Sequence, residues 1–166
     1  MSDVWMTLTP SELSNCWDVA VQRSIWIMRE NRQQPTYGSS RLWRERIAQD
    51  VLSCPTEYAV AKWTGQYWHG AEPYDPDAPD VGQDIEVRAT HHETGRLLVH
   101  DADHDDRRFY LVIPHPTNPF RYRIVGWLWG AEAKQRQWWR TDVREPCYLA
   151  PQPCLHDAVR LFTHAG

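Results

Sequence analysis

The first apolar positions of the chain follow the period of an α-helix. They lie three or four residues apart, as they do along one face of a helix. Thr9 and Glu12 fit an N-cap and its capping-box acid, the pattern continues to about Asn31, and a loop is expected over residues 33–40. We therefore predict one buried stripe, formed by Leu13, Trp17, Val21, Ile25 and Met28, with Cys16 and Ala20 beside them.

Two more helices are predicted before a proline-rich segment. The first covers Leu42 to Leu52, and Pro55 then opens a second one from about Thr56 to Thr64. Gly65 ends it, since glycine is favoured just after the last helical residue. Residues 66–79 contain three prolines and are expected to be mostly irregular.

After this segment the hydrophobic period changes from helical to two. Ile85, Val87 and Ala89 alternate with polar residues, which is typical of a strand with one buried face. Three more strands are predicted at residues 96–100, 109–114 and 121–129, and a turn at residues 94–95 follows the first strand. The continuous apolar runs in the 96–100 and 109–114 strands favour a sheet that is covered on both faces.

The order of these elements predicts the fold class. Helices come first, strands follow, and short helical pieces are expected at residues 131–139 and 153–162. This order is typical of a layered α/β (α+β) domain. We expect residues 1–166 to form a single domain around a mixed four- to five-stranded sheet flanked by helices. It would have an N-terminal helical part (1–54), a core (55–134) and a C-terminal extension (135–166).

Composition narrows the class of protein. No apolar run approaches the length needed to span a membrane, and the N-terminus lacks the pattern of a signal peptide, so we expect a cytoplasmic protein. Four cysteines occur without a CxxC pair, which favours reduced, buried thiols. Most of the ten tryptophans are expected in the core or at interfaces, and a minority could stack on bases.

The charges are unevenly distributed, although the net charge is only −4. Residues 22–46 hold six arginines and two glutamates, and residues 121–144 hold six basic and two acidic side chains. Residues 72–106 between them hold eleven acids and two arginines. Basic flanks around an acidic centre suit a metal site bordered by phosphate-binding surface, and they also suit an ordinary mixed surface. We expect Arg23, Arg29, Arg41, Arg44 and Arg46 on helix surfaces, where some of them could contact phosphate.

The segment from Pro79 to Arg88 carries the candidate chemistry. On a strand, residues two apart point the same way, so Asp84, Glu86 and Arg88 are expected to share one face. Asp80 precedes the strand, and a tight turn there would place it beside Glu86. Two adjacent carboxylates repel each other, and a hard divalent cation such as Mg²⁺ or Mn²⁺ relieves the repulsion. Arg88 would face the same site and steady a phosphate.

These residues resemble the core of the PD-(D/E)XK nuclease superfamily. Asp80 matches the motif aspartate, residues 86–88 match the (D/E)xK tripeptide, and Glu57 matches the acid on a preceding helix. The region from about residue 56 to 134 is also similar to small uncharacterised bacteriophage proteins. The resemblance implies a restriction-endonuclease-like core and a Mg²⁺-dependent endo- or exodeoxyribonuclease. Asp80, Glu86 and Glu57 would hold the metal ion, Arg88 would complete the catalytic set, and the protein would act on DNA in a host cytoplasm.

Two departures from the motif keep other interpretations open. Arg88 replaces the usual lysine, and arginine can stabilise charge but cannot act as a base near neutral pH. The short gap from Asp80 to Glu86 leaves Asp84 as an alternative metal ligand, and the acids could also form an ordinary exposed strand face. A catalytically inactive nuclease-like fold that binds nucleic acid, or an inhibitor of a host protein, is the alternative function. A homodimer is also left open.

Two further motifs are interpreted as structural. Acids recur at alternate positions of residues 100–106, but the run lacks the glycine and glutamate that a calcium-binding EF-hand loop needs. We expect a solvated hairpin loop there. His91 and His92 are adjacent and would point to opposite faces of a strand, so a surface turn is expected rather than a metal site.

Overall fold

The computed structural model describes residues 4–29, 43–70, 75 and 77–158, and shows a mixed α+β fold with two sheets. The larger sheet has four strands, which lie in the order β1 (Val4–Thr7), β5 (Arg121–Trp129), β4 (Arg108–Pro114) and β2 (Ile85–Ala89). The smaller sheet has three strands, in the order β3 (Leu97–Val99), β7 (Cys147–Ala150) and β6 (Trp139–Arg140). The helices are α1 (Pro10–Arg29), α2 (Trp43–Thr64) and the short α3 (Gly130–Ala133).

The larger sheet is mixed, as the sequence predicts. β5 pairs antiparallel with both β1 and β4, whereas β2 and β4 are parallel. A parallel pair needs a crossover connection, and here the chain makes it by passing through β3 in the smaller sheet. β2, which carries the candidate site, lies at one edge of the larger sheet, and β1 lies at the other edge.

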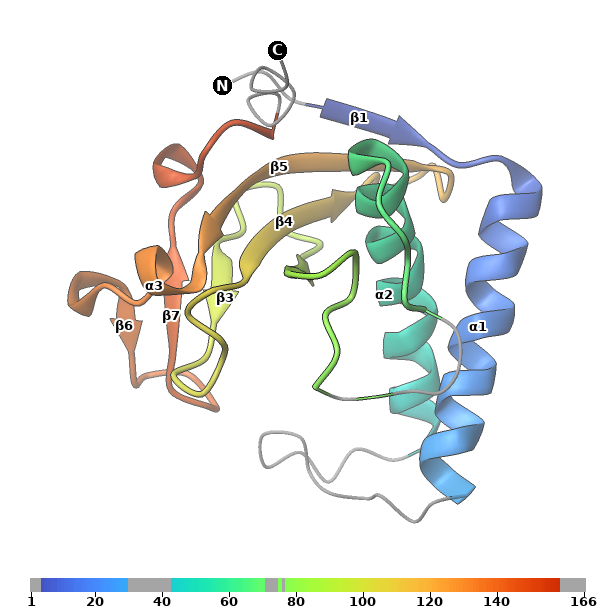
Figure 1. Cartoon of the computed structure of the whole chain (residues 1–166), viewed down its shortest axis with the longest axis horizontal. Helices are drawn as coiled ribbons and strands as arrows, with labels where there is room; N and C mark the ends of the chain where they lie inside the picture. Colours follow the sequence, from blue (N-terminus) through green and yellow to red (C-terminus); the bar gives the residue numbers. More distant parts are fainter. Residues whose placement is uncertain (1–3, 30–42, 71–74, 76, 159–166) are drawn as a thin grey trace.

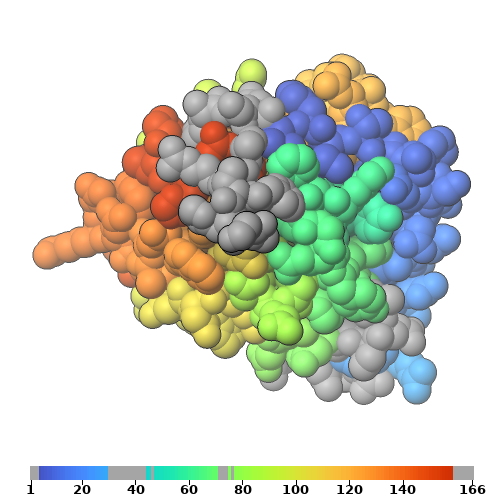
Figure 2. Space-filling view, turned by 45° about the horizontal axis from the view of Figure 1, so that its top comes forward, coloured from blue at the N-terminus to red at the C-terminus, as the bar shows by residue number. Residues whose placement is uncertain are grey.

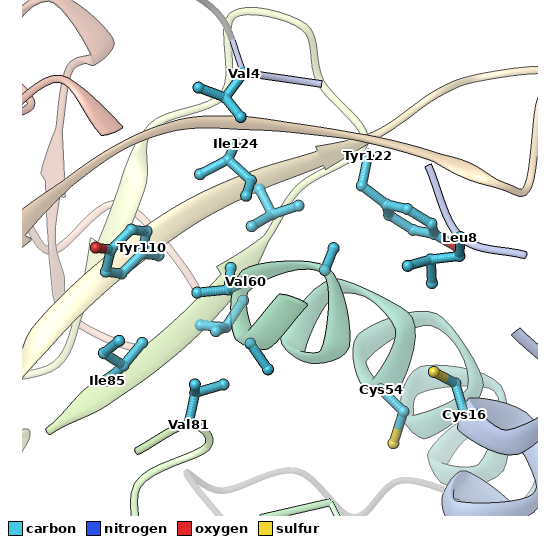
Figure 3. Close-up of a cluster of buried hydrophobic side chains, with 14 of the residues drawn as sticks. Val4, Leu8, Cys16, Cys54, Val60, Val81, Ile85, Tyr110, Tyr122 and Ile124 are labelled. Atoms are coloured by element: carbon cyan, nitrogen blue, oxygen red, sulfur yellow. The ribbon is translucent and has the colours of Figure 1, made fainter. Parts of the chain in front are cut away.

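Each face of the larger sheet has its own hydrophobic core. On one face, which α2 covers (Figure 1), the core holds side chains such as Ile85, Tyr110 and Ile124 (Figure 3). On the other face, the smaller sheet packs against Phe109 and Leu111 of β4. The expectation that the apolar run in β4 is covered on both sides is confirmed. Helices, however, cover one face of this sheet, while the second sheet covers the other.

The start of α1 is confirmed, but its predicted buried stripe is wrong. The Thr9 N–H donates to Glu12 Oε2 (2.7 Å), and the Glu12 N–H donates to Thr9 Oγ1 (3.2 Å), which is a capping box. The predicted end near Asn31 and the loop over 33–40 lie outside the described residues. Of the predicted stripe, Leu13 is buried, and the exposed members are Trp17, Val21, Ile25 and Met28.

The buried face of α1 combines small and larger side chains. Leu13, Val19 and Ile27 are buried on it together with a row of small residues, Cys16, Ala20 and Ser24. The Ser24 hydroxyl donates to Asp50 Oδ2 at 2.6 Å, which joins the two helices. The exposed members of the predicted stripe lie on the outer side of α1, away from this buried face.

The second and third predicted helices are one helix. α2 continues through Pro55, although proline lacks an N–H and removes one helical hydrogen bond. The Thr56 hydroxyl donates to the Ser53 carbonyl (2.7 Å) within the same turn. Gly65 follows the last helical residue with φ +66°, so the predicted end is correct. The start predicted at Leu42 lies outside the described residues.

The C-terminal part differs from the prediction. Instead of one helix over 131–139, α3 is followed by a 3₁₀ helix at Arg136–Trp138. Instead of a helix from residue 153, the chain forms a 3₁₀ helix at Gln152–Cys154 and then pairs His156 with Trp127 through backbone hydrogen bonds of 2.9 and 3.1 Å. The part of that prediction beyond residue 158 is not described.

Three strands were not predicted: β1, β6 and β7. They are two to four residues long, too short to show a period. Figure 2 shows the segment around α3 and β6, in orange, at the opposite end of the molecule from α1, in blue.

The cysteines are free thiols, as expected. Cys16, Cys54 and Cys147 are buried, as predicted, whereas Cys154 is exposed, so the expectation of burial is wrong for it. Burial raises the pKa of Cys16 to about 12, and the charges of Glu57 and Glu12 raise it in the same direction. Such a thiol stays protonated near neutral pH and behaves as a small apolar side chain.

Candidate active site

A small β-ladder lies at the start of β2. Trp68 and Val81 form one antiparallel bridge, and Val81 and Ile85 form a second. Val81 and Ile85 exchange two backbone hydrogen bonds of 3.1 and 3.2 Å. Facing residues of an antiparallel pair point to the same side, so this register places Asp80 opposite Glu86. Both acids lie on the side away from the core that buries Val81 and Ile85.

A three-residue turn, residues 82–84, makes this arrangement fit the short gap in the sequence. Gly82 has φ +60°, a conformation that favours glycine. A Cβ atom at this position would lie 1.9 Å from Oε1 of Gln66. This oxygen is the end of a flexible side chain and can move, so the positive φ is what favours glycine, and the turn returns the chain to β2 with Asp80 beside it.

Asp80 is a partly buried carboxylate among like charges. Its Oδ2 accepts the Val87 N–H at 2.8 Å. Burial raises its pKa well above its usual range, and the negative charges of Glu57 and Glu86 raise it further. The Val87 hydrogen bond and the Arg88 charge act in the opposite direction without balancing these effects. The negative charge that Asp80 carries when ionised is therefore not balanced by the positive groups around it.

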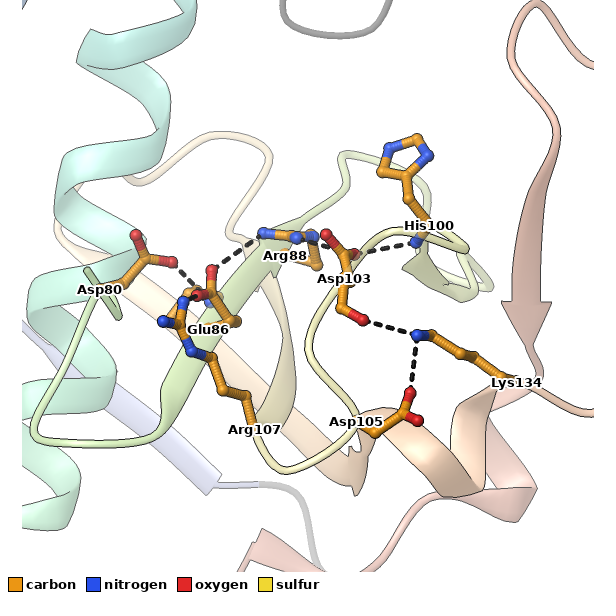
Figure 4. Close-up of polar contacts among 9 residues, drawn as sticks. Asp80, Glu86, Arg88, His100, Asp103, Asp105, Arg107 and Lys134 are labelled. Carbon is orange, nitrogen blue, oxygen red and sulfur yellow. Dashed lines mark hydrogen bonds and ion pairs between the residues drawn. The ribbon is translucent and has the colours of Figure 1, made fainter. Parts of the chain in front are cut away.

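Glu86 is bound by two arginines (Figure 4). Arg107 Nη1 donates to its Oε1, and Arg88 Nη1 lies 3.5 Å from its Oε2. The second nitrogen of Arg107 donates to the Asp77 carbonyl. The Glu86 side chain is 14% exposed, so these contacts are only partly screened by solvent. Glu86 therefore carries a paired charge directly opposite an under-neutralised one.

Arg88 connects this pair to an acid that the sequence did not mark as functional. Its Nη2 donates to Asp103 Oδ2 at 3.1 Å, and its guanidinium lies over the Phe109 ring, 5.1 Å from the centroid. The same Asp103 oxygen accepts the His100 N–H at 2.8 Å. Burial acts to lower the pKa of Arg88, but the charges of Asp103 and Glu86 raise it. Arg88 therefore keeps its positive charge, and its contacts hold the guanidinium in place.

Glu57 lies in the middle of α2 rather than in the first turn of a separate helix. It is 4% exposed, and both of its oxygens are occupied. Arg23 donates to the two oxygens at 3.0 Å each, and Trp68 Nε1 donates to Oε2 at 2.9 Å. Arg23 is therefore in the interior, and the expectation of a helix-surface position is wrong for it. Glu57 is close enough to raise the pKa of Asp80.

Asp84 is separated from the candidate site by its own arginine. Arg108 holds its two oxygens at 2.7 and 2.6 Å. The Arg108 guanidinium also lies 5.8 Å from the centroid of the Trp129 ring. The structure therefore brings Asp80, and not Asp84, opposite Glu86.

The sequence missed the partners that define this site. Asp103, Arg107 and Arg23 hold Arg88, Glu86 and Glu57, respectively. The charge pattern marked the segments that contain Arg23 and Asp103 as basic and acidic, but it could not assign ion pairs. Such pairing depends on long-range packing, because the partners are 15 to 34 positions apart in the chain.

The two structural motifs have different outcomes. His91 and His92 are exposed in a bend next to a turn, as predicted. The loop over 100–106 is not a hairpin, because β3 pairs with β7 and β4 pairs with β2 and β5. Asp103 turns inward from this loop to reach Arg88, while its neighbours at 101, 102 and 104–106 are exposed.

The donor set limits how a metal ion could bind. Within the described ranges, no three His, Cys, Asp or Glu side chains are arranged to share one ion. Asp80 and Glu86 face each other, and Mg²⁺ is often held through one or two carboxylates with water completing its shell. The excess negative charge around Asp80 also fits a cation. The residues present therefore fit a two-carboxylate site better than a three-ligand site that includes Glu57.

Two further findings bear on the class of protein. No helix in the described part of the chain combines the length and the apolar character needed to cross a lipid bilayer. No protein-family model, curated protein or solved structure matches the chain.

Proposed function

We propose that the chain is a divalent-metal-dependent nuclease that hydrolyses phosphodiester bonds in DNA. The observation that carries this proposal is the facing pair of carboxylates, Asp80 and Glu86, in which Asp80 has a raised pKa and, among the residues that the structure describes, accepts no hydrogen bond from an arginine. A bound cation would neutralise this charge. The proposal also agrees with the resemblance of these residues to the PD-(D/E)XK motif.

Asp80 and Glu86 would hold a Mg²⁺ or Mn²⁺ ion. When bound, such an ion lowers the pKa of its water and neutralises charge on a phosphate. Glu57 would act indirectly, because Arg23 and Trp68 occupy its oxygens. Its negative charge adds to the field that favours a cation near Asp80.

The arginines would bind the phosphate. Arg88 remains protonated, and its planar guanidinium can hold two phosphate oxygens. Asp103 orients it from one side and Phe109 supports it from below. Arg107 neutralises Glu86 in the described structure, and it would be released toward the phosphate when a cation takes its place. Arg88 therefore stabilises charge in this proposal and does not act as a base.

A cleavage assay tests the proposal. Plasmid, linear duplex and single-stranded DNA are incubated with the protein in Mg²⁺, Mn²⁺ or a chelator. We expect cleavage only with a divalent ion, and a loss of at least about 100-fold in Glu86→Gln, since even residues that merely support metal ligands cost 10–100-fold when removed. Asp84→Asn is the matched control, because this nearby acid is paired with Arg108. Undiminished cleavage by Glu86→Gln, or none with any metal, contradicts the proposal.

A second candidate is a nuclease-like fold that binds nucleic acid or a host protein without catalysis. One observation favours it: Arg23 saturates Glu57, and Arg107 and Arg88 pair with Glu86. A site whose acids already have cationic partners has less need of a metal ion. DNA retention without cleavage, together with no change in thermal stability on addition of Mn²⁺, would support this candidate over the first.

A further inference from the structure

The β-ladder at the candidate site carries two aromatic side chains in addition to the acids. Trp68 pairs with Val81, so His69 lies opposite Asp80 and Tyr67 lies opposite Gly82. The hydrogen bonds agree with this register: the His69 N–H donates to the Asp80 carbonyl (3.1 Å), and the Gly82 N–H donates to the Tyr67 carbonyl (2.8 Å). Because facing residues share a side, the Tyr67 and His69 side chains leave the ladder on the side of Asp80.

Tyr67 is the most exposed large hydrophobic side chain in the described part of the chain. Its relative exposure is 71%, whereas the next, Ile25, reaches 53%. A single exposed apolar side chain is ordinary on a protein surface, so what distinguishes Tyr67 is its position on the side of Asp80 and the ring packed against it. Trp68, its neighbour, points inward and is bound to Glu57, so the exposure of Tyr67 follows from the alternation along this segment.

His69 supports one edge of the exposed Tyr67 ring. Its ring packs against Tyr67 edge to face, with centroids 5.0 Å apart and planes at 89°. His69 Nε2 lies 2.6 Å from the Gly82 carbonyl oxygen. A carbonyl only accepts hydrogen bonds, so Nε2 carries the proton and the imidazole is anchored to the turn that positions Asp80. Pre-ordered rings lose little conformational entropy on binding.

We infer that Tyr67, supported by His69, is a stacking platform for an unpaired base of the nucleic acid bound at Asp80 and Glu86. The inference rests on the proposed function for the identity of the polymer, and it adds the substrate class: single-stranded DNA, or duplex with an unpaired end or flap. Bases within a duplex are stacked on each other, so their faces are closed to a protruding ring. An unpaired base offers both faces.

The dimensions of the ladder agree with one bound strand. Neighbouring strands of a ladder lie about 4.8 Å apart, so His69, which faces Asp80, is two such spacings, roughly 10 Å, from Glu86, and Tyr67 lies two residues further along its segment. A short stretch of nucleotide chain spans this distance. Its base would lie on Tyr67, while its phosphates would lie near Arg88 and Arg107, the cations beside Glu86.

Binding measured without cleavage tests the inference. Fluorescence anisotropy with a labelled oligothymidylate of about 16 nucleotides, and with a blunt duplex, is recorded in chelator at one fixed salt concentration. We expect Tyr67→Ala to weaken single-strand binding by about 5- to 100-fold, as one lost base stack predicts. Tyr67→Phe should bind nearly as wild type, and Trp17→Ala, an exposed aromatic on α1, serves as the control.

The outcomes separate this inference from the proposed function. Single-strand binding by Tyr67→Ala that equals wild type overturns it, as does an equal loss on the blunt duplex or no binding of the single strand by wild type. Selective loss in Tyr67→Ala supports it, even if no metal produces cleavage, in which case only the hydrolytic proposal fails. If cleavage depends on Glu86 but Tyr67→Ala binds single strands with unchanged affinity, the nuclease proposal stands and the stacking role of Tyr67 is wrong.

Discussion

Glu57 and Asp80 are neighbouring acids with opposite electrostatic surroundings. Glu57 receives a two-pronged ion pair from Arg23 and an indole N–H from Trp68. Asp80 receives one backbone N–H and lies near the negative charges of Glu57 and Glu86. The comparison shows that the positions of the arginines, rather than those of the acids, distinguish a closed structural ion pair from a site with room for a cation.

The largest expected effect is at the closed pair. Arg23→Met leaves Glu57 buried without its cation, and we expect the free energy of unfolding to fall by about 3–5 kcal/mol. Urea denaturation measures it. Lys62→Met is the control, because it breaks the more exposed Lys62–Glu12 ion pair and should cost less than about 1 kcal/mol. Equal losses in the two variants would show that the buried Arg23–Glu57 pair contributes no more to stability than an exposed ion pair does.

The second effect has the opposite sign. Asp80→Asn removes an under-neutralised charge and keeps an oxygen that can accept the Val87 N–H, so in chelator near neutral pH we expect a gain on the order of 1 kcal/mol. Asp84→Asn, which weakens the ion pair with Arg108, should instead lose about 1 kcal/mol. Divalent cation should stabilise wild type but not Asp80→Asn. A stability loss in Asp80→Asn would contradict the electrostatic description of this site.

The stability difference between Asp80→Asn and wild type should also depend on pH. The raised pKa means that the folded chain binds the Asp80 proton more tightly than the unfolded chain does. The contribution of Asp80 to the free energy of unfolding therefore falls as the pH rises from about 3.8, its ordinary pKa, through the raised pKa. The advantage of Asp80→Asn over wild type should grow across this window and vanish below it. Denaturation curves in chelator at several pH values measure the difference, and an advantage independent of pH would exclude titration of Asp80 as its cause.

The smallest expected effect is at Arg88. Arg88→Lys keeps a cation that can reach Asp103, so we expect a stability loss below about 1 kcal/mol and cleavage that persists. Arg108→Lys is the comparison: it replaces a guanidinium that holds two oxygens of Asp84 and should cost more. Loss of cleavage in Arg88→Lys would show that the planar guanidinium, and not the positive charge alone, is required.

The strand at the candidate site could be predicted because local alternation fixes it. Ile85 and Val87 are buried and Glu86 and Arg88 face the other way, which follows from the period of two. The turn at Gly82 also follows from local chemistry. The facing of Asp80 and Glu86 was therefore within reach of the sequence, whereas the engagement of Asp84 by Arg108 was not, since that partner is 24 positions away.

The helices show why hydrophobic spacing alone was insufficient. The large apolar side chains of α1 have helical spacing, but Cys16, Ala20 and Ser24 also have it. The choice between the two faces depends on which of them α2 packs against, and no count of apolar residues within α1 contains this information. The same limit applies to Arg23. The sequence pattern predicts this side chain on the helix surface, but its ion pair with the buried Glu57 places it in the protein interior.

The hydrogen bond from Val87 to Asp80 has a consequence for assembly. β2 is an edge strand of the larger sheet, and strands in this position can recruit strands of other molecules and so promote aggregation. A carboxylate that occupies an outward N–H of β2 discourages such recruitment. A substitution that removes this oxygen, such as Asp80→Ala, would therefore lower solubility on concentration, independently of any catalytic role.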